Sequence, residues 1–373
     1  MKYFIIAGEA SGDLHGSHLV EQIKFVDKNA DFEGWGGDLL IKQGVKVHKH
    51  IRDLAFMGFV EVLQNLSEIR KNFRLCKKQI TEYNPDAVIF VDYPGFNLRL
   101  AKWVKKHSYK SIYFISPNVW AWKASRVYKI RDYTDKMYVI LPFEKDFYAK
   151  YGIEVEYYGH PLTDIIKNYL KKSDDDFHKE HNLDLRPIIA LMAGSRKQEI
   201  KHMLPVMIEA SEEFPEYNFV ITGAPAIDKE YYTQFLKNSD VKLVFGQTYE
   251  VLSHSIAGLI TSGTATLEAA LFRLPQVVCY KGGRISVAIA RLVANVKYIS
   301  LVNLILDKNA VCELIQNDLN KENLKKELKK ILPNGEKFSF VKDNYITLYK
   351  KLDKDNIYLK IAESIKDDIS NEK

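Results

Sequence analysis

The segment 92–97, Asp-Tyr-Pro-Gly-Phe-Asn, places a carboxylate at the end of a short apolar run. The run Ala87–Val91 predicts a strand, Pro94 ends it, and Asn97 can cap the helix that follows. Asp92 is therefore expected at the carboxyl end of a parallel strand, where open α/β sheets bind ligands. A carboxylate there can take a proton from a hydroxyl nucleophile, or it can simply bond to N–H groups of its own turn. The residues alone leave both interpretations open.

Two further turns have residues that suit a phosphate group. Gly194, Ser195 and Arg196 follow the apolar run Ile188–Met192, and the planar guanidinium and the N–H groups of a helix start both attract phosphate. The turn 262–264, Ser-Gly-Thr, also precedes a helical pattern. A surface arginine in the first turn and ordinary N-capping in the second would explain the same residues. Neither turn is a Walker A motif.

The first glycine-rich turn, residues 8–16, follows the apolar run Tyr3–Ala7 and opens a helical pattern. Its glycines allow a ligand to approach the backbone closely, and the helix start favours anions. The turn does not have the G-x-G-x-x-G spacing of a dinucleotide site, and it can equally be only a turn.

The segment 116–123 contains two tryptophans, Trp120 and Trp122, directly after an expected strand at Ser111–Ile115. In a loop these rings could stack on a sugar or an acyl chain. They could equally seal the core of the domain.

The segment 55–69 is apolar on more than one helical face, and a basic stretch follows it at residues 70–78. An apolar helix with a basic flank suits an anionic membrane surface. A buried helix with a solvated basic end explains the same pattern, and periodicity alone favours that explanation.

Metal-binding patterns are weak throughout the sequence. Residues 174–176 and 353–355 have D-x-D spacing, but neither follows an expected strand, so we interpret both as solvated charge. His48 and His50 lack a convincing ligand partner. We therefore expect no catalytic metal and no cofactor.

Short apolar runs alternate with amphipathic stretches along the chain, which predicts parallel sheets covered by helices on both faces. The pattern begins near Ile5 and again near Ala190, with the polar stretch 171–176 between. We expect two Rossmann-like domains, at residues 1–170 and 171–335. The helices of 336–373 are expected to pack back on the first domain or on a partner subunit.

The 373 residues suit two domains, and 46% hydrophobic residues allow each to bury a core. The net charge of +6 favours anionic partners. Three cysteines without a C-x-x-C pair argue against a zinc site or a disulfide framework and fit a reducing compartment. The apolar run at residues 3–7 is too short for the core of a signal peptide, and no apolar run is long enough to span a membrane.

An ordered set of segments resembles the lipid-A-disaccharide synthase family, from about residue 3 to about residue 305. The segments are Gly8–Asp13, Phe56–Leu63, Asp92–Asn97, Pro117–Trp122, Leu141–Glu144, Gly159–Pro161, Gly194–Arg196 and Ser262–Glu268. Ala193, where the family often has proline, and Leu40, where it often has methionine, depart from the pattern.

The resemblance implies an inverting glycosyltransferase of the GT-B type, with two parallel sheets facing a central cleft. Such an enzyme joins UDP-2,3-diacylglucosamine to 2,3-diacylglucosamine 1-phosphate and releases the β-1,6 lipid A disaccharide 1-phosphate and UDP. The resemblance also implies a cytoplasmic protein that is peripheral on the cytoplasmic face of the inner membrane. We expect no nucleic acid partner and leave a homodimer open.

The resemblance also implies roles for individual residues. Asp92 would be the general base on the acceptor hydroxyl. The expected UDP-binding residues are Gly194, Ser195, Arg196, Ser262, Gly263, Thr264, Glu268 and Asn303. Glu268 among them would bind the ribose. The expected acceptor or loop residues are Glu9, Ser11, Gly12, Asp13, Asn118 and Trp120, and the expected membrane contacts are Met57, Val60, Leu63 and Leu66.

Two other functions share parts of this pattern. A UDP-sugar 2-epimerase can have the same two-domain architecture and would need no lipid surface. A non-enzymatic lipid carrier would not need two helix starts that suit phosphate.

Overall fold

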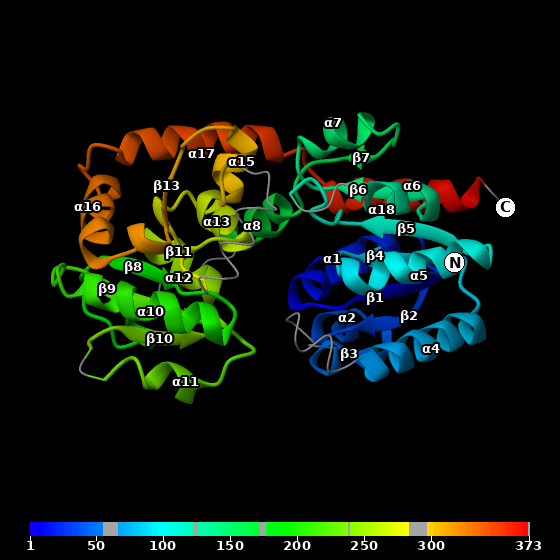
Figure 1. The fold of residues 1–373 in the computed structure, drawn as a ribbon, viewed down its shortest axis with the longest axis horizontal. Coiled ribbons are helices and arrows are strands. Elements are labelled where there is room, and N and C mark those ends of the chain that lie inside the picture. Colours follow the sequence, from blue (N-terminus) through cyan, green and yellow to red (C-terminus); the bar gives the residue numbers. More distant parts are fainter. Residues whose placement is uncertain (55–65, 122–125, 172–176, 238, 283–296, 372–373) are drawn as a thin grey trace. The chain divides into compact units, whose positions relative to one another are not determined.

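The computed structural model describes residues 1–54, 66–121, 126–171, 177–237, 239–282 and 297–371. The chain forms two compact units. The first comprises Met1–Pro161 together with Lys354–Lys373, and the second comprises Leu162–Asp353. Each unit has its own parallel sheet with helices packed against it (Figure 1).

The sheet of the first unit has seven strands in the order β3-β2-β1-β4-β5-β6-β7. Every pair of neighbours is parallel. The central strands are apolar and buried, as expected where helices cover both faces of a sheet. The strands are β1 (Lys2–Ala7), β2 (Asp31–Gly36), β3 (Lys46–His50), β4 (Ala87–Val91), β5 (Lys110–Phe114), β6 (Lys136–Val139) and β7 (Glu156–Tyr157).

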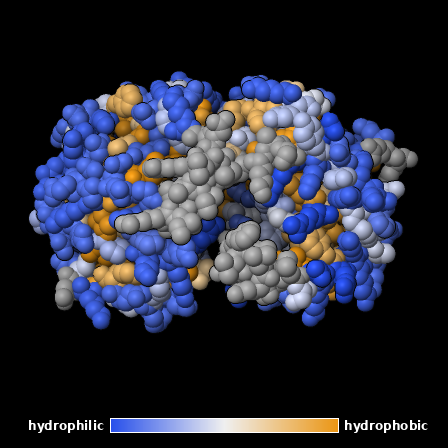
Figure 2. Space-filling view, viewed as in Figure 1, coloured by the Kyte–Doolittle hydropathy of each residue, from blue (hydrophilic) through white to orange (hydrophobic). Residues whose placement is uncertain are grey.

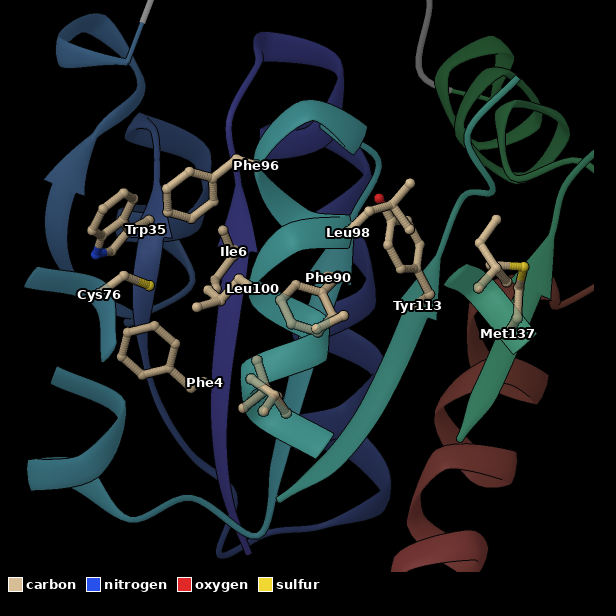
Figure 3. Close-up of a cluster of buried hydrophobic side chains, with 14 of the residues drawn as sticks. Phe4, Ile6, Trp35, Cys76, Phe90, Phe96, Leu98, Leu100, Tyr113 and Met137 are labelled. Carbon is tan, nitrogen blue, oxygen red and sulfur yellow. The ribbon is translucent and has the colours of Figure 1, made fainter. Parts of the chain in front are cut away.

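Helices from both ends of the chain cover this sheet. The last helix, α18, packs against α1, and Tyr358 of α18 bonds to His15 of α1 at 2.6 Å. Large side chains, among them Phe4, Trp35 and Phe90, form the core (Figure 3). The helices are α1 (Ala10–Val26), α2 (Asp38–Lys42), η1 (Ile51–Asp53), α4 (Leu66–Tyr83), α5 (Pro94–Lys106), α6 (Val127–Tyr133), α7 (Glu144–Ala149) and α18 (Ile357–Ser370).

The sheet of the second unit has six strands in the order β10-β9-β8-β11-β12-β13, again all parallel. The strands are β8 (Ile188–Met192), β9 (Asn218–Gly223), β10 (Lys242–Phe245), β11 (Ser255–Thr261), β12 (Gln276–Tyr280) and β13 (Cys312–Ile315). The helices are α8 (Leu162–Leu170), α9 (Phe177–Glu180), α10 (Lys197–Ser211), α11 (Lys229–Thr233), α12 (Thr248–His254), α13 (Thr264–Leu271), α15 (Leu301–Leu306), η3 (Gln316–Asp318), α16 (Lys321–Ile331) and α17 (Phe338–Leu352).

The expected class, two parallel α/β domains, is confirmed. The structure divides the chain before α8 rather than after residue 170, because α8 packs against α13 of the second unit. Of the helices expected beyond residue 335, α17 belongs to the second unit and α18 returns to the first.

The described surface is mainly hydrophilic on the face shown in Figure 2, with smaller apolar areas. Among the described residues, no helix combines the length and the apolar character that crossing a bilayer requires.

Candidate active site

Each sheet has one point at which the order of its strands reverses direction, and the turns that carry Asp92, Arg196 and Gly263 lie there. In the first unit, β1 is the neighbour of β4, with Ala7 opposite Val91. In the second unit, β8 is the neighbour of β11, with Met192 opposite Ile260. The turns that follow these strands therefore lie side by side in each unit. Such reversal points are where open α/β sheets bind ligands.

The turn that carries Asp92 is strained and firmly held. Asp92 and Tyr93 have φ angles of 43° and 49°, in the left-handed region that residues other than glycine seldom adopt. The Asp92 N–H donates to the carbonyl of Phe114 at 3.1 Å. The Asp92 carbonyl accepts from the Tyr113 hydroxyl at 2.6 Å and from the Asn97 amide at 2.8 Å. These three bonds fix the backbone from which the carboxylate projects.

The neighbouring turn after β1 leaves room for this arrangement. A Cβ atom on Gly8 would lie 2.3 Å from the ring of Tyr93, so only glycine fits there. Gly12 lies close to the ends of β1 and β4, where its Cβ would be 3.4 Å from Ala7 and 3.6 Å from the carbonyl of Val91. The two turns therefore pack tightly together.

The electrostatic setting of Asp92 suits a general base. Burial and, to a smaller extent, the nearby carboxylate of Glu9 raise the pKa of its carboxyl from 3.8 to about 7, against the opposing effect of a bond from the Tyr93 N–H. A base with a pKa close to the working pH is ionised yet still a good proton acceptor. The geometry and the charge environment are therefore both compatible with the predicted role of Asp92 as a base.

The other predicted residues of the first turn differ in burial and in hydrogen-bond partners. Glu9 is half-buried at the start of α1, and Ser11 is exposed. Asp13 is buried, and its carboxylate accepts N–H groups of Gly37, Leu39 and Leu40 at 2.7, 3.0 and 3.2 Å. Asp13 therefore caps α2, and its carboxylate is not available to act as a base or to bind the acceptor.

The loop after β5 lies beside the Asp92 turn because β5 is the neighbour of β4. Asn118 is exposed in this loop. Trp120 is half-buried and packs edge-on against Phe143, with ring centroids 5.0 Å apart. Trp120 therefore packs on the protein while part of its side chain stays accessible, and whether that part stacks on a ligand stays a prediction. Trp122 lies outside the described residues.

In the second unit, the turn after β8 is shaped around a glycine and a glutamate. Gly194 has a φ of 113°, and a Cβ there would lie 2.6 Å from Glu199. The Ser195 N–H donates to Glu199 Oε2 at 3.0 Å. Arg196 reaches Glu199 Oε1 at 3.4 Å, and 60% of its side chain is exposed. A carboxylate of the protein itself therefore occupies the place where an anionic ligand would meet this helix start.

The turn after β11 is open by comparison. Helix α13 begins without a side-chain cap, at Gly263, which is exposed and has a φ of 149°. The Ser262 hydroxyl donates instead to the carbonyl of Ile299 at 2.8 Å. N-capping by Ser262 or Thr264 is therefore not what these residues do. An uncapped, exposed helix start suits a phosphate group.

Two further residues predicted for the nucleotide already have partners in the protein. Glu268 accepts a hydrogen bond from the Tyr249 hydroxyl at 3.1 Å, and burial raises its pKa. The Asn303 amide is fully buried. It donates to Val311 O and Glu313 Oε1, both at 2.9 Å, and accepts from the N–H groups of Ala310 and Val311 at 2.8 and 3.0 Å. All four of its hydrogen-bonding positions are used, so Asn303 fixes the segment before β13.

Some predictions fall outside what the structure describes. Met57, Val60 and Leu63 lie among residues 55–65, and the side chain of Leu66 is not described either. The described residues contain no group of three or more His, Cys, Asp or Glu side chains that could hold a metal ion.

Sequence reasoning missed the residues that support the site. The sequence pattern does not single out Tyr113, Glu199 and Tyr249, because a tyrosine in an apolar strand and a glutamate or a tyrosine in a first helical turn have many ordinary uses. Their roles depend on contacts between neighbouring turns of a sheet, and no local pattern records those contacts.

Solved structures with the same fold cover nearly the whole chain. UDP-GlcNAc 2-epimerase from Neisseria meningitidis, bound to UDP-GlcNAc, is 13% identical with a TM-score of 0.67 and covers 98% of this chain and 99% of its own. The calicheamicin glycosyltransferase CalG4 is 12% identical with a TM-score of 0.62 and covers 99% and 98%. At this identity the likeness shows the fold alone.

Sequence relatives are more specific. Lipid-A-disaccharide synthase from Coxiella burnetii (strain CbuK_Q154) is 33% identical over 97% of this chain and 96% of its own length. Lipid-A-disaccharide synthase 1 from Legionella pneumophila (strain Paris) is 38% identical over 85% of this chain and 84% of its own. The family model of lipid-A-disaccharide synthetase matches residues 3–366. The chain belongs to the lipid-A-disaccharide synthase family of glycosyltransferases.

Proposed function

We propose that this protein joins UDP-2,3-diacylglucosamine to 2,3-diacylglucosamine 1-phosphate, with Asp92 as the catalytic base. The observation that carries the proposal is the Asp92 turn. Its backbone is strained and held by hydrogen bonds, and the pKa of its carboxyl, about 7, lies close to neutral pH. In the reaction, Asp92 takes the proton of the acceptor 6-hydroxyl while the oxygen of that hydroxyl attacks the anomeric carbon of the donor. The bond from that carbon to UDP breaks, and the configuration inverts.

The charge that builds on the departing UDP needs stabilisation. The guanidinium of Arg196 and the N–H groups at the start of α13 supply positive charge for a diphosphate. The N–H groups at the start of α10 can add to it once Glu199 moves away from them. These groups can do the work of a divalent cation, so we propose that turnover is independent of metal. Activity should persist in excess EDTA. Loss of activity that magnesium or manganese restores would contradict this part of the proposal.

Nucleotide recognition involves two further residues in different ways. We assign the ribose hydroxyls to Glu268, whose carboxylate Tyr249 orients. Asn303 acts indirectly, since its amide holds the backbone of Ala310 and Val311 rather than a ligand.

One experiment separates this function from the two alternatives. Radiolabelled UDP-diacylglucosamine is incubated with the protein, with and without the acceptor. The proposal predicts a labelled disaccharide phosphate and an equal amount of UDP, both only when the acceptor is present. A labelled epimer formed from the donor alone would instead identify a 2-epimerase, and stoichiometric binding without any product would identify a carrier.

A peripheral membrane contact is part of the proposal, since both substrates carry acyl chains. The described part of the basic flank supports it: Arg70, Arg74 and Lys78 are exposed on α4, while Cys76 and Ile80 face the core. Such a face attracts an anionic lipid surface. We further propose a cytoplasmic location on the inner face of the inner membrane.

Vesicle sedimentation tests the membrane contact. Replacing Arg70, Arg74 and Lys78 with glutamine should reduce sedimentation with anionic vesicles. Replacing the exposed residues Arg99, Lys102 and Lys106 of α5 removes the same charge and should have little effect. Equal losses in both variants would show only a general attraction of net charge, and the proposed contact would be wrong.

We also propose a homodimer. Phe340 and Ile346 of α17 are 50% and 47% exposed, which is unusual for large apolar side chains. Light scattering should give a mass of about twice the 43.1 kDa of one chain. A mass of one chain at micromolar concentration would contradict the dimer.

A further inference from the structure

Three neighbouring strands of the first sheet end at the same edge. Strands β4, β5 and β6 are adjacent in the sheet. The Asp92 turn follows β4, the loop 116–121 follows β5, and Glu144 begins α7 shortly after β6. The described part of one segment that marked the sequence, Pro117–Ala121, therefore lies between the base and a second such segment, Leu141–Glu144.

Glu144 is buried at the centre of this group, with 1% of its surface exposed. One carboxylate oxygen accepts the N–H groups of Leu141 and Ile140 at 2.9 and 3.2 Å. Burial raises the pKa of Glu144 to about 7, while these two N–H groups and the side chains of Trp120 and Ser116 act in the opposite direction. The carboxylate therefore fixes the segment directly before α7.

The inner side of the loop 116–121 is fixed by the same helix. The Ser116 hydroxyl lies 2.6 Å from the Tyr148 hydroxyl of α7 and 2.9 Å from the carbonyl of Pro117. Val119 is buried in the core. The indole N–H of Trp120 is buried without a well-aligned partner, and its ring packs on Phe143, the residue before Glu144. Only Asn118, at the outer side, is fully exposed.

A carboxylate at such a position needs an explanation beyond stability. Burying an ionisable group is unfavourable, and an apolar side chain of similar size would pack here at less expense. A buried carboxylate can, however, fix the positions of several hydrogen-bond donors at once. The donors it fixes, the N–H groups of Ile140 and Leu141, lie directly before α7, the helix that contacts the loop beside the Asp92 turn.

We propose that Glu144 is a positioning residue for the acceptor. By fixing the start of α7 it places Tyr148 and Phe143 against Ser116 and Trp120, and this sets the loop 116–121 so that Asn118 reaches the sugar hydroxyls of the acceptor beside Asp92. This inference rests on the proposed function, since it takes the edge of the first sheet as the acceptor site. Glu144 does not touch the substrate. It acts through the loop, so its loss affects acceptor binding and leaves the nucleotide site in the other unit unchanged.

The test compares three variants by acceptor KM, kcat, UDP affinity and melting temperature. Glu144→Ala removes every contact and should raise the KM for the acceptor by about tenfold or more, as expected when hydrogen bonds to a charged group are lost. Glu144→Gln keeps an acceptor oxygen for the N–H groups of Leu141 and Ile140 and should have a smaller effect. Asp146→Asn is the matched control, because it removes one exposed charge from the same helix and should leave all values unchanged. UDP affinity should be the same in all three.

A folded Glu144→Ala variant with an unchanged acceptor KM would overturn the inference, and so would an equal loss of UDP affinity, which indicates general damage. If Glu144→Ala does not fold, Glu144→Gln and Tyr148→Phe decide: each should raise the acceptor KM with UDP affinity intact, and no rise in either contradicts the inference. Calorimetric binding of the acceptor to the same variants separates this inference from the proposed function. Binding that weakens with these substitutions supports the positioning role even if the wild type forms no disaccharide.

Discussion

Replacing Asp92 with asparagine should slow the reaction and stabilise the protein at the same time. The pKa of Asp92 is raised from 3.8 to about 7 in the folded protein. The neutral carboxyl is therefore favoured in the folded state, and the stability it contributes is complete below about pH 4 and is lost as the pH rises through 7. The difference between these two pKa values corresponds to a loss of at most roughly 4 kcal/mol in the free energy of unfolding above pH 7. Asparagine cannot ionise, so the variant does not lose this stability.

The assay is thermal unfolding at pH 5 and at pH 8, together with kcat. One kcal/mol shifts the melting temperature of a domain of this size by about 2–4 °C. If only a quarter of that maximum stability difference is realised, the melting temperature of Asp92→Asn should exceed that of the wild type by about 2–4 °C at pH 8. The two melting temperatures should differ less at pH 5. Asparagine also tolerates the positive φ of this turn, so the backbone should keep its shape. In the same variant, kcat should fall by about 10²–10⁴-fold, because the base is lost.

The pH dependence of kcat supplies the second half of this prediction. The wild type should lose activity below a midpoint of about pH 7, where Asp92 becomes protonated, and the variant should lack this acid limb. A variant with near-normal kcat and the same acid limb would show that the base lies elsewhere. An unchanged melting temperature at pH 8 would show that Asp92 is not held in a setting that opposes its ionisation.

Three other substitutions test the surroundings of the two turns. Glu9→Gln removes the charge that helps to raise the pKa of Asp92, so the acid limb should move to lower pH; a limb that stays in place would exclude this electrostatic coupling. Arg196→Ala should weaken UDP binding by about tenfold or more, the effect of losing a charged hydrogen bond, and unchanged calorimetric affinity in a folded variant would count against Arg196 as a diphosphate ligand. Glu199→Gln keeps an oxygen for the Ser195 N–H but removes the negative charge that a diphosphate would meet there, so UDP should bind about three- to tenfold more tightly, equivalent to roughly 1 kcal/mol. Weaker binding would mean that the Glu199 charge is needed to orient Arg196.

The apolar strands of both sheets could be predicted from the sequence, whereas the more polar strands β2 and β3 could not. The runs Ala87–Val91 and Ile188–Met192 are buried on both faces, so their composition alone marks them. Strands β2 (Asp31–Gly36) and β3 (Lys46–His50) carry acidic, basic and glycine residues. Pairing with β1 and with each other forms these strands, and local sequence does not record it.

The candidate site shows the same division. The Asp92 turn could be located because proline and glycine end a buried strand. The sequence could not distinguish Asp92 from Asp13, since both are acidic residues in glycine-containing turns. The structure separates them by burial and partners: the Asp13 carboxylate accepts three N–H groups of another segment, whereas the bonds from Tyr113 and Asn97 go to the Asp92 backbone carbonyl.

The predicted boundary after residue 170 differs from the boundary before Leu162 in the structure, because here too the deciding contacts are distant in the sequence. Charge and low hydrophobicity mark the stretch 171–176 as a linker, but α8 before it already packs against α13. Likewise, the pairing of α18 with α1 joins residues at opposite ends of the chain, through His15 and Tyr358. Contacts of such long sequence separation leave no periodic signal.

The most direct test of the central claim is the identity of the product. Purified protein is incubated with UDP-2,3-diacylglucosamine and 2,3-diacylglucosamine 1-phosphate, and the product is examined by mass spectrometry and by NMR of its anomeric proton. The account predicts a disaccharide 1-phosphate joined by a β-1,6 bond, formed by the wild type and nearly absent with Asp92→Asn. A product with the α configuration, or one that Asp92→Asn forms at the wild-type rate, would contradict direct displacement with Asp92 as the base.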